Sequence, residues 1–310
     1  MRILLWHVHG AWTTSLVHGP HEYVVPVLPD RGPDGVGVAR TYPWPDGVLE
    51  LTPEQLRDED FDVVLLQRPD ELERLMPEWL GRVPGRDIPA VYVEHNAPQG
   101  RIAEMRHPAA DRPDLLLVHV THFNALFWDA GSTPTRVVEH GIVDPGHRYT
   151  GELPRAAVVI NEARRRGRVT GTDLLERFAE AAPIDLFGID AASVGGIEDL
   201  AQRDLHAEMA RRRVYVHPIR WTSLGLSLLE AMHLGMPVVA LGTTEAHEAV
   251  PPEAGAVSTR IDVLAGAMRR MIDDPGEARE RGAAARAAAL RRYGLERFLA
   301  DWDAVLEEVA

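Results

Sequence analysis

The 310-residue chain contains no cysteine and no lysine. Without cysteine it can form no disulfide, no thiolate metal site and no cysteine nucleophile. Without lysine it has no Schiff-base chemistry and no P-loop lysine. A bound phosphate must therefore be met by arginine, by backbone amides or by a helix N-terminus.

Positive charge is also scarce, since the formal net charge is -14 at pH 7. This argues against a general affinity for nucleic acid or anionic membranes, because both kinds of binding rely on clustered cations. The opening MRILLWHVHG is too short and too polar for a signal peptide or a membrane span. We expect a cytoplasmic protein with no integral membrane segment and no nucleic-acid partner.

Short, continuous apolar runs alternate with segments of helical length. Such runs favour parallel strands covered by helices on both faces, so the predicted fold class is α/β. The pattern restarts after a Pro- and Gly-containing stretch from Asp144 to Pro154, which indicates two doubly wound domains. The runs lie at 3–8, 23–28, 62–67, 90–95, 115–120, 156–161, 184–189, 214–219 and 238–242.

The expected domains are 1–147 and 148–294. Residues 295–310 carry apolar side chains at intervals of three and four, which predicts an amphipathic helix that packs back toward the N-terminal domain. The stretch from Pro29 to Pro45 is rich in Pro, Gly and Asp and suits a long surface loop.

The stretch from Val214 to Leu241 reads as a strand, a loop, a buried helix and a second strand. Glu230 is the only acid within this apolar surround, and a buried carboxylate needs partners to offset its desolvation. Glu230 is therefore the leading candidate for a ligand contact. It can accept two hydroxyl hydrogen bonds from a ribose, while the amides of Thr222, Ser223, Leu224 and Gly225 at the helix start can bind phosphate.

Two strand ends in the N-terminal half carry polar residues, and ligands of parallel sheets bind beyond such ends. The first is followed by His9, Gly10 and Trp12, then by a Thr13–Ser15 run that can cap a helix and favour an anion. The alternative is an ordinary turn. The second carries Glu94, His95 and Asn96, which we expect to touch substrate hydroxyls, with a structural histidine as the alternative.

An arginine run follows the first strand of the C-terminal half. Charge runs are usually solvated, but one or two of these side chains directed into the site would neutralise a diphosphate. The run consists of Arg164, Arg165, Arg166 and Arg168.

Three motifs resemble those of retaining glycosyltransferases with the GT-B fold, particularly the large family 4. SLGLSLLEAMHLGMPVVAL is similar to the donor-site signature, which has a Glu, seven residues, a second Glu and then Ala-Met. HGIVDP resembles the turn at the domain junction, and RRRGRVTGTDLL resembles the phosphate-binding segment. The resemblance implies two Rossmann-like domains facing across a cleft, with a nucleotide-sugar donor on the C-terminal domain and a small-molecule or glycan acceptor on the N-terminal domain. It implies no cofactor and no obligatory metal.

The resemblance also assigns roles to residues. Glu230 corresponds to the ribose contact, Arg165 to the phosphate-binding arginine, and His95 to a histidine near the transferred sugar, so these three are the catalytic candidates. Gly10 falls in the glycine loop that faces the donor phosphates. The remaining donor-side candidates are Arg164, Arg168, Thr222, Ser223, Leu224 and Gly225, and the acceptor-side candidates are His9, Trp12, Glu94 and Asn96.

The chain departs from the signature at two positions. Thr222 replaces the first glutamate, and Thr170 replaces the lysine of the phosphate segment. Either a neighbouring arginine supplies the missing cation and Thr222 makes a different sugar contact, or catalysis is lost. The alternatives to a transferase are thus a non-catalytic nucleotide-sugar-binding protein and a nucleotide-sugar epimerase of the same fold. A phosphorylase is excluded, because its pyridoxal cofactor needs a lysine.

Overall fold

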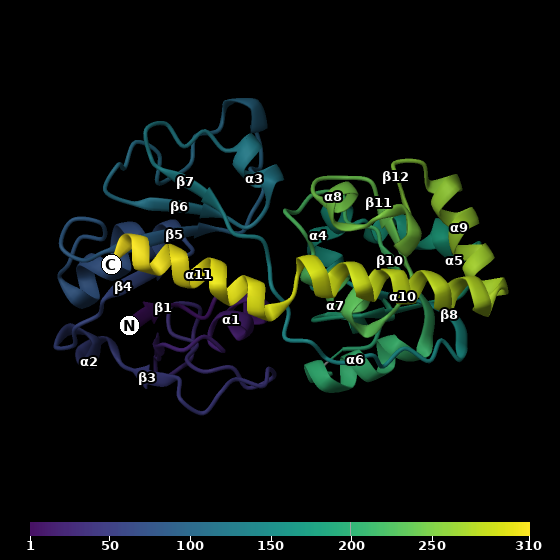
Figure 1. The fold of residues 1–310 in the computed structure, drawn as a ribbon, viewed down its shortest axis with the longest axis horizontal. Coiled ribbons are helices and arrows are strands. Elements are labelled where there is room, and N and C mark those ends of the chain that lie inside the picture. Colours follow the sequence, from purple (N-terminus) through teal and green to yellow (C-terminus); the bar gives the residue numbers. More distant parts are fainter. Residues whose placement is uncertain (199) are drawn as a thin grey trace. The chain divides into compact units, whose positions relative to one another are not determined.

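The computed structural model describes residues 1–198 and 200–310, which form two units. The first unit is Met1–Gly141 together with Leu295–Ala310, and the second is Ile142–Gly294. Each unit has its own parallel β-sheet covered by helices (Figure 1). This confirms the expected α/β class with two doubly wound sheets. The units meet along the sequence at Gly141 and Ile142, where the sequence suggested 147 and 148.

The first unit contains a seven-stranded parallel sheet with the order β3-β2-β1-β4-β5-β6-β7. Its central strands are buried on both faces, as the continuous apolar runs predicted. The strands are β1 (Arg2–Leu5), β2 (Glu22–Pro26), β3 (Leu49–Leu51), β4 (Val63–Leu66), β5 (Ala90–Glu94), β6 (Leu116–His119) and β7 (Thr135–Val137).

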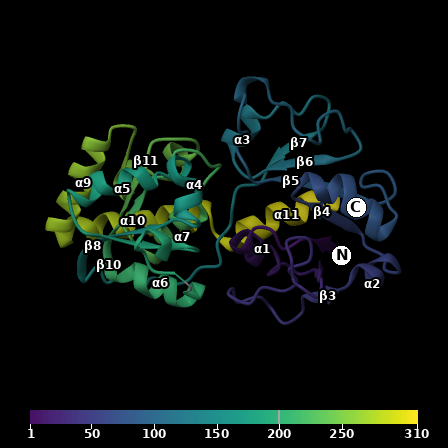
Figure 2. The same ribbon diagram turned by 180° about the vertical axis from the view of Figure 1, so that it is seen from behind.

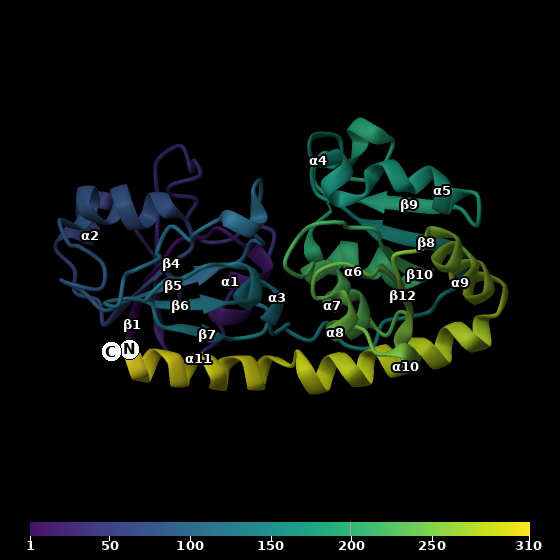
Figure 3. The same ribbon diagram turned by 90° about the horizontal axis from the view of Figure 1, so that it is seen from above.

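Helices cover both faces of this sheet (Figure 3). Helices α2 and η1 pack on one face through Leu56, Leu75 and Met76. On the other face α1 contacts α11, where the rings of Trp12 and Trp302 meet edge to face at 5.5 Å. The helices are α1 (Gly10–Leu16), α2 (Pro53–Arg57), η1 (Glu71–Leu80), η2 (Ile102–Glu104), α3 (His122–Phe127) and α11 (Leu295–Val309).

The second unit contains a five-stranded parallel sheet with the order β12-β11-β10-β8-β9. Counted from β8, the chain therefore follows the order 2-1-3-4-5, one of the two common doubly wound orders. The strands are β8 (Leu153–Val159), β9 (Ile184–Phe187), β10 (Arg212–His217), β11 (Val238–Leu241) and β12 (Gly255–Ser258).

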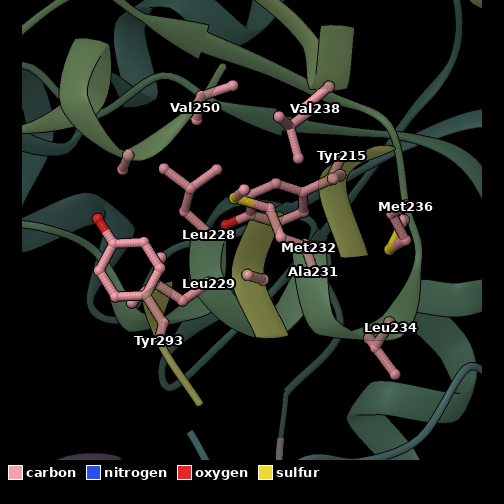
Figure 4. Packing of buried hydrophobic residues seen from close by; sticks show 14 of the residues in the cluster. Tyr215, Leu228, Leu229, Ala231, Met232, Leu234, Met236, Val238, Val250 and Tyr293 are labelled. Atoms are coloured by element: carbon pink, nitrogen blue, oxygen red, sulfur yellow. The ribbon is translucent and has the colours of Figure 1, made fainter. Parts of the chain in front are cut away.

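Two hydrophobic clusters cover the two faces of the second sheet. One joins the sheet to α5 and α9, and the other joins it to α6, α7 and α10. Leu228, Leu229 and Met232 of α7 lie at the centre of the second cluster (Figure 4). The helices are α4 (Ala163–Thr170), η3 (Thr172–Leu174), α5 (Leu175–Ala179), η4 (Ala191–Val194), α6 (Gln202–Arg211), α7 (Leu226–Leu234), α8 (Ala246–Ala249), η5 (Pro252–Ala254), α9 (Ile261–Asp273) and α10 (Pro275–Arg292).

The run Thr13–Ser15 does not cap a helix, which corrects the expectation from the sequence. Helix α1 begins at Gly10, and these three residues are buried inside it. The Thr13 and Thr14 hydroxyls donate to the carbonyls of His9 and Gly10, four residues back, as interior Ser and Thr side chains often do. Both hydroxyls are therefore bonded to the backbone of the first turn of α1.

The described residues form no helix that is both long enough and apolar enough to cross a membrane.

Candidate functional site

Each sheet has one point where neighbouring strands continue into helices on opposite faces. In the first unit this switch point lies between β1 and β4, and in the second between β8 and β10. Ligands of doubly wound sheets bind outside the carboxyl ends of the strands at such points. The residues that follow these strands are therefore the candidate site.

Helix α7 carries Glu230 beside β10. The helix begins after Gly225 and ends at Gly235, whose φ of 88° is the left-handed conformation that favours glycine at a helix end. All residues from Leu228 to Leu234 are buried, so the helix is enclosed on every side. Glu230 is 7% exposed. Its carboxylate is thus held in the interior of the unit, as the sequence predicted.

Two side chains of α6 surround the Glu230 carboxylate. The Gln202 amide Nε2 donates to Glu230 Oε1 at 2.9 Å. His206 Nε2 lies 3.6 Å from Glu230 Oε2. Helices α6 and α7 pack side by side, which brings these groups together (Figure 2). The sequence predicted that Glu230 needs partners but did not identify them.

The loop before α7 is held tightly against β10. Ser223 and Leu224 are buried, whereas Thr222 is partly exposed. A Cβ atom at Gly225 would overlap the ring of His217, the last residue of β10, so glycine is required there. Gly225 is the N-cap of α7 and has no side chain to accept from the first N–H groups of the helix. The Leu228 N–H donates to the Gly225 carbonyl at 3.0 Å, so the amides of Leu226 and Ser227 are the ones at the helix start that could meet an anion.

Hydroxyl groups line the junction of β10 and α7. The Tyr215 hydroxyl donates to Ser227 Oγ at 2.9 Å and lies 3.4 Å from His217 Nδ1. Burial raises the pKa of Tyr215 and lowers the pKa of His217 to about 4. This junction is therefore polar but uncharged at neutral pH.

The arginine run forms α4, which follows β8. Arg165 Nε donates to Glu162 Oε1 at 2.7 Å, and the Arg165 side chain is 68% exposed. Arg164 donates to the Ser193 carbonyl, and Arg168 lies 3.4 Å from Asp173 Oδ2. These three side chains are exposed, as charge runs usually are.

Arg166 and Thr170 differ from the rest of α4. Arg166 is partly buried, and desolvation followed by the nearby Arg165 lowers its pKa. Gly167 interrupts the helix at φ 44° and ψ -114°. The buried Thr170 hydroxyl donates to the Gly167 carbonyl, so Thr170 stabilises the backbone at the position where the family resemblance expects a lysine.

Three histidines lie close together at the strand ends of the first unit. The rings of His9 and His95 are 4.0 Å apart between centroids. Burial lowers the pKa of His9 to about 4, of His140 to about 3, and of His95 well below its ordinary value; the other histidines of the trio lower the pKa of His95 further. All three are therefore neutral imidazoles at pH 7, able to donate or accept hydrogen bonds without carrying charge.

The other acceptor-side candidates have structural partners. Trp12 is fully buried and packs edge to face on His95, with ring centroids 4.8 Å apart. Glu94 Oε2 accepts from His107 Nε2 at 2.9 Å, and Glu94 Oε1 accepts from the backbone N–H of Asn96 at 2.6 Å. The Asn96 side chain is exposed. Trp12 and Glu94 thus orient their neighbours, while His9, His95 and Asn96 remain near the strand ends.

Gly10 lies under the ring of Tyr42, which comes from the long loop after β2. A Cβ at Gly10 would meet Tyr42 Cε2 at 2.5 Å, so the close approach requires glycine. In the structure it is this tyrosine ring that faces Gly10.

No group of three or more His, Asp or Glu side chains could hold a metal ion among residues 1–198 and 200–310.

Comparison with known proteins bears on both units. Residues 150–274 match the family model described as "Glycosyl transferases group 1". Sucrose-phosphate synthase from Thermosynechococcus elongatus superposes with a TM-score of 0.71 at 13% identity, covering 99% of this chain and 98% of that one. HepE from Anabaena, solved with UDP-glucose, superposes with a TM-score of 0.70 at 15% identity, covering 99% of this chain and 100% of HepE.

The chain has the GT-B fold. TarM from S. aureus, solved as a mutant in complex with UDP, superposes with a TM-score of 0.60 at 13% identity. The superposition covers 79% of this chain and 55% of TarM, so this chain spans about half the length of TarM. No curated protein sequence matches the chain.

Within its GT-B fold the chain gathers the donor-side candidates Ser223, Leu224, Gly225 and Glu230 around β10 and α7. Gln202, His206 and His140 also lie at the candidate sites; the sequence analysis did not name them as site residues, although His140 is the first residue of the HGIVDP motif. The spacing of Gln202 and His206 was a usable signal, because residues four apart share a helix face. His140 comes shortly after β7, which places it near a strand end.

Proposed function

We propose that the chain is a retaining glycosyltransferase of the family 4 type, which moves a sugar from a nucleoside diphosphate to an acceptor hydroxyl. The observation that carries the proposal is Glu230, a buried carboxylate on α7 at the switch point of the second sheet. It lies inside the segment 150–274 that matches a glycosyltransferase family model. A carboxylate at this place suits the hydroxyls of a nucleoside sugar.

The donor diphosphate would bind at the start of α7. The N–H groups after Gly225 and the arginines of α4 would stabilise the charge that develops on the leaving diphosphate. Arg165 is the proposed phosphate contact, with Arg164 and Arg168 as the neighbouring cations. Binding a diphosphate would then replace the pairing of Arg165 with Glu162.

The acceptor would bind at the strand ends of the first unit. His9 and His95 are neutral there, so they would position hydroxyl groups by hydrogen bonding rather than by charge. Trp12 packs edge to face on the ring of His95 and so restricts its orientation. His95 is the residue that we propose lies nearest to the transferred sugar.

We propose that the reaction uses no cofactor and no metal ion, because arginines and helix-start amides supply the countercharge for the diphosphate. Turnover should therefore be unchanged by EDTA.

The test is turnover of nucleotide sugars, beginning with UDP-glucose, the ligand of the HepE structure. Glu230→Ala and Arg165→Ala should each lower kcat/KM at least tenfold, the loss expected for a hydrogen bond to a charged group. NMR of the product should show the anomeric configuration of the donor. Unchanged kinetics in both variants would contradict the proposed site, and an inverted anomer would contradict retention.

A non-catalytic nucleotide-sugar-binding protein is the second candidate, and Thr222 is the observation that favours it. This residue stands where the signature has its first glutamate, and its side chain has no carboxylate to offer the sugar. Calorimetric binding of a donor without transfer to any acceptor would support this candidate. Thr222→Glu should then increase turnover if the missing acid is the cause. Interconversion of the donor sugar in the absence of an acceptor would instead indicate an epimerase.

A further inference from the structure

The two oxygens of the Glu230 carboxylate have different surroundings. Oε1 accepts a hydrogen bond from Gln202 Nε2 at 2.9 Å. Oε2 lies 3.6 Å from His206 Nε2, which is too far for a hydrogen bond. One oxygen therefore already accepts a hydrogen bond from the protein, whereas the other lies near a nitrogen without bonding to it.

His206 Nε2 is buried and has no hydrogen-bond partner among the described residues. The His206 residue is 5% exposed, and Glu230 is 7% exposed. A buried polar atom without a partner costs free energy that a ligand can recover by supplying one. The Oε2 and Nε2 atoms thus form an open polar pair inside the unit.

A single hydroxyl group satisfies both atoms of this pair. It can donate its hydrogen to Glu230 Oε2 while its oxygen accepts from the His206 Nε2–H, because a hydroxyl is both donor and acceptor. A second hydroxyl on the same sugar would have to share Glu230 Oε1 with the Gln202 amide, which already donates to it. The arrangement therefore fits one hydroxyl better than a vicinal pair.

We infer that the chain holds one hydroxyl of the nucleoside sugar between Glu230 and His206, and that Gln202 takes the place of a second. Ribose offers adjacent 2′ and 3′ hydroxyls, whereas 2′-deoxyribose offers only the 3′ hydroxyl. With the 3′ hydroxyl in this place, the donor site accepts a 2′-deoxyribonucleoside diphosphate as well as its ribo counterpart. This inference rests on the proposed function, in which Glu230 contacts the nucleoside sugar.

The test is calorimetric binding of matched pairs of nucleotides, UDP with dUDP and GDP with dGDP, to the full-length protein. Each pair differs only in the 2′ hydroxyl, so the ratio of the two dissociation constants isolates its contribution whatever the base. For the wild type we expect a ratio within about threefold. Gln202→Ala frees Glu230 Oε1 and should shift the ratio about tenfold in favour of the ribonucleotide, the value of one hydrogen bond.

Two further variants separate binding from folding. Arg203→Ala, on an exposed position of the same helix, should leave both dissociation constants unchanged. His206→Phe should weaken the ribo and deoxy forms alike, because both use the remaining hydroxyl site; circular dichroism shows whether this variant is folded.

The possible results separate a failure of this inference from a failure of the proposed function. A wild-type preference for the ribonucleotides above threefold, or an unchanged ratio in Gln202→Ala, overturns the inference while nucleotide binding stands. Failure of every nucleoside diphosphate to bind overturns the proposed function, and the inference falls with it.

Discussion

The ring of His217 occupies the space that a side chain at residue 225 would need, so the end of β10 and the start of α7 fit together only with glycine at that position. Gly225→Ala should displace the loop Thr222–Gly225 and destabilise the protein by about 1–3 kcal/mol, the usual cost of overpacking. Affinity for nucleoside diphosphates should fall with it. Chemical denaturation and calorimetry measure the two effects.

A second substitution identifies the ring as the cause. His217→Ala in the Gly225→Ala background should recover part of the lost stability, because the ring that the new methyl group meets is gone. The double-mutant cycle should therefore give a favourable coupling free energy. Additive effects of the two substitutions would show that the ring is not what excludes a side chain at residue 225.

Arg165 and Glu162 form an exposed ion pair that should compete with a bound diphosphate. Glu162→Ala removes the competing carboxylate and should strengthen binding of a nucleoside diphosphate by a few-fold, whereas Arg165→Ala should weaken it. Arg260→Ala is the matched control, since Arg260 is equally exposed and pairs with Asp262 elsewhere in the same unit. If Arg260→Ala weakens binding as much as Arg165→Ala, the effect comes from net charge alone.

Acid should destabilise the first unit through its buried histidines. Burial lowers the pKa of His9 and His119 to about 4 and of His140 to about 3, against 6.5 for an unburied histidine. Above pH 6.5 the rings are neutral in both states. Below it the unfolded chain binds protons that the folded chain does not, so the free energy of unfolding should fall as the pH drops from about 6.5 to about 4.

His119→Leu tests this dependence, because neither ring nitrogen of His119 has a hydrogen-bond partner among the described residues. The Tm of the variant should fall less than that of the wild type between pH 7 and pH 5. His122→Leu, at an exposed position of α3, serves as the control. Equal slopes for His119→Leu and the wild type would show that this ring does not drive the loss.

Glu71 supplies a buried acceptor to the turn after β4. It is fully buried and accepts from the backbone N–H groups of Gln67 and Arg68 and from Arg68 Nε. Glu71→Ala would leave these donors and the Arg68 charge without their carboxylate and should cost about 3–5 kcal/mol in denaturant titrations.

A partly exposed pair provides the comparison for Glu71. Glu50 accepts from Arg31 at 2.8 Å, with both side chains about a third exposed, and Glu50→Ala should cost no more than about 1 kcal/mol. Equal losses in the free energy of unfolding for the two variants would mean that the burial of Glu71 does not increase its contribution to stability.

The sequence predicted the strands that are buried on both faces, because those strands need continuous apolar runs. Val63–Leu66 is one example, with every residue buried. It missed β3, β7 and β12, whose three or four residues are partly or largely exposed and include Glu50, Arg136 and Ser258. Such short edge strands are defined by hydrogen bonds to a neighbouring strand, which leave little trace in hydrophobic patterning.

The sequence also predicted that Glu230 is a buried carboxylate but could not supply its partners. Gln202 and His206 lie 28 and 24 residues before it, and only the packing of α6 on α7 brings them to its two oxygens. The arginine run shows the converse limit. Four arginines within five positions indicate a charged segment, but the sequence does not show that Arg165, before the break at Gly167, pairs with Glu162 and Arg168, after it, with Asp173.

The C-terminal helix α11 completes the core of the first unit, since Trp302 and Phe298 pack on Trp12 and Phe298 also fills the space beside Gly141. During synthesis these two aromatic residues leave the ribosome only after the whole of Ile142–Gly294. Domains usually fold in the order in which they are made. Here the first-made unit must wait, with Trp12 uncovered, until the second has been translated, so the order of synthesis and the order of completion are reversed.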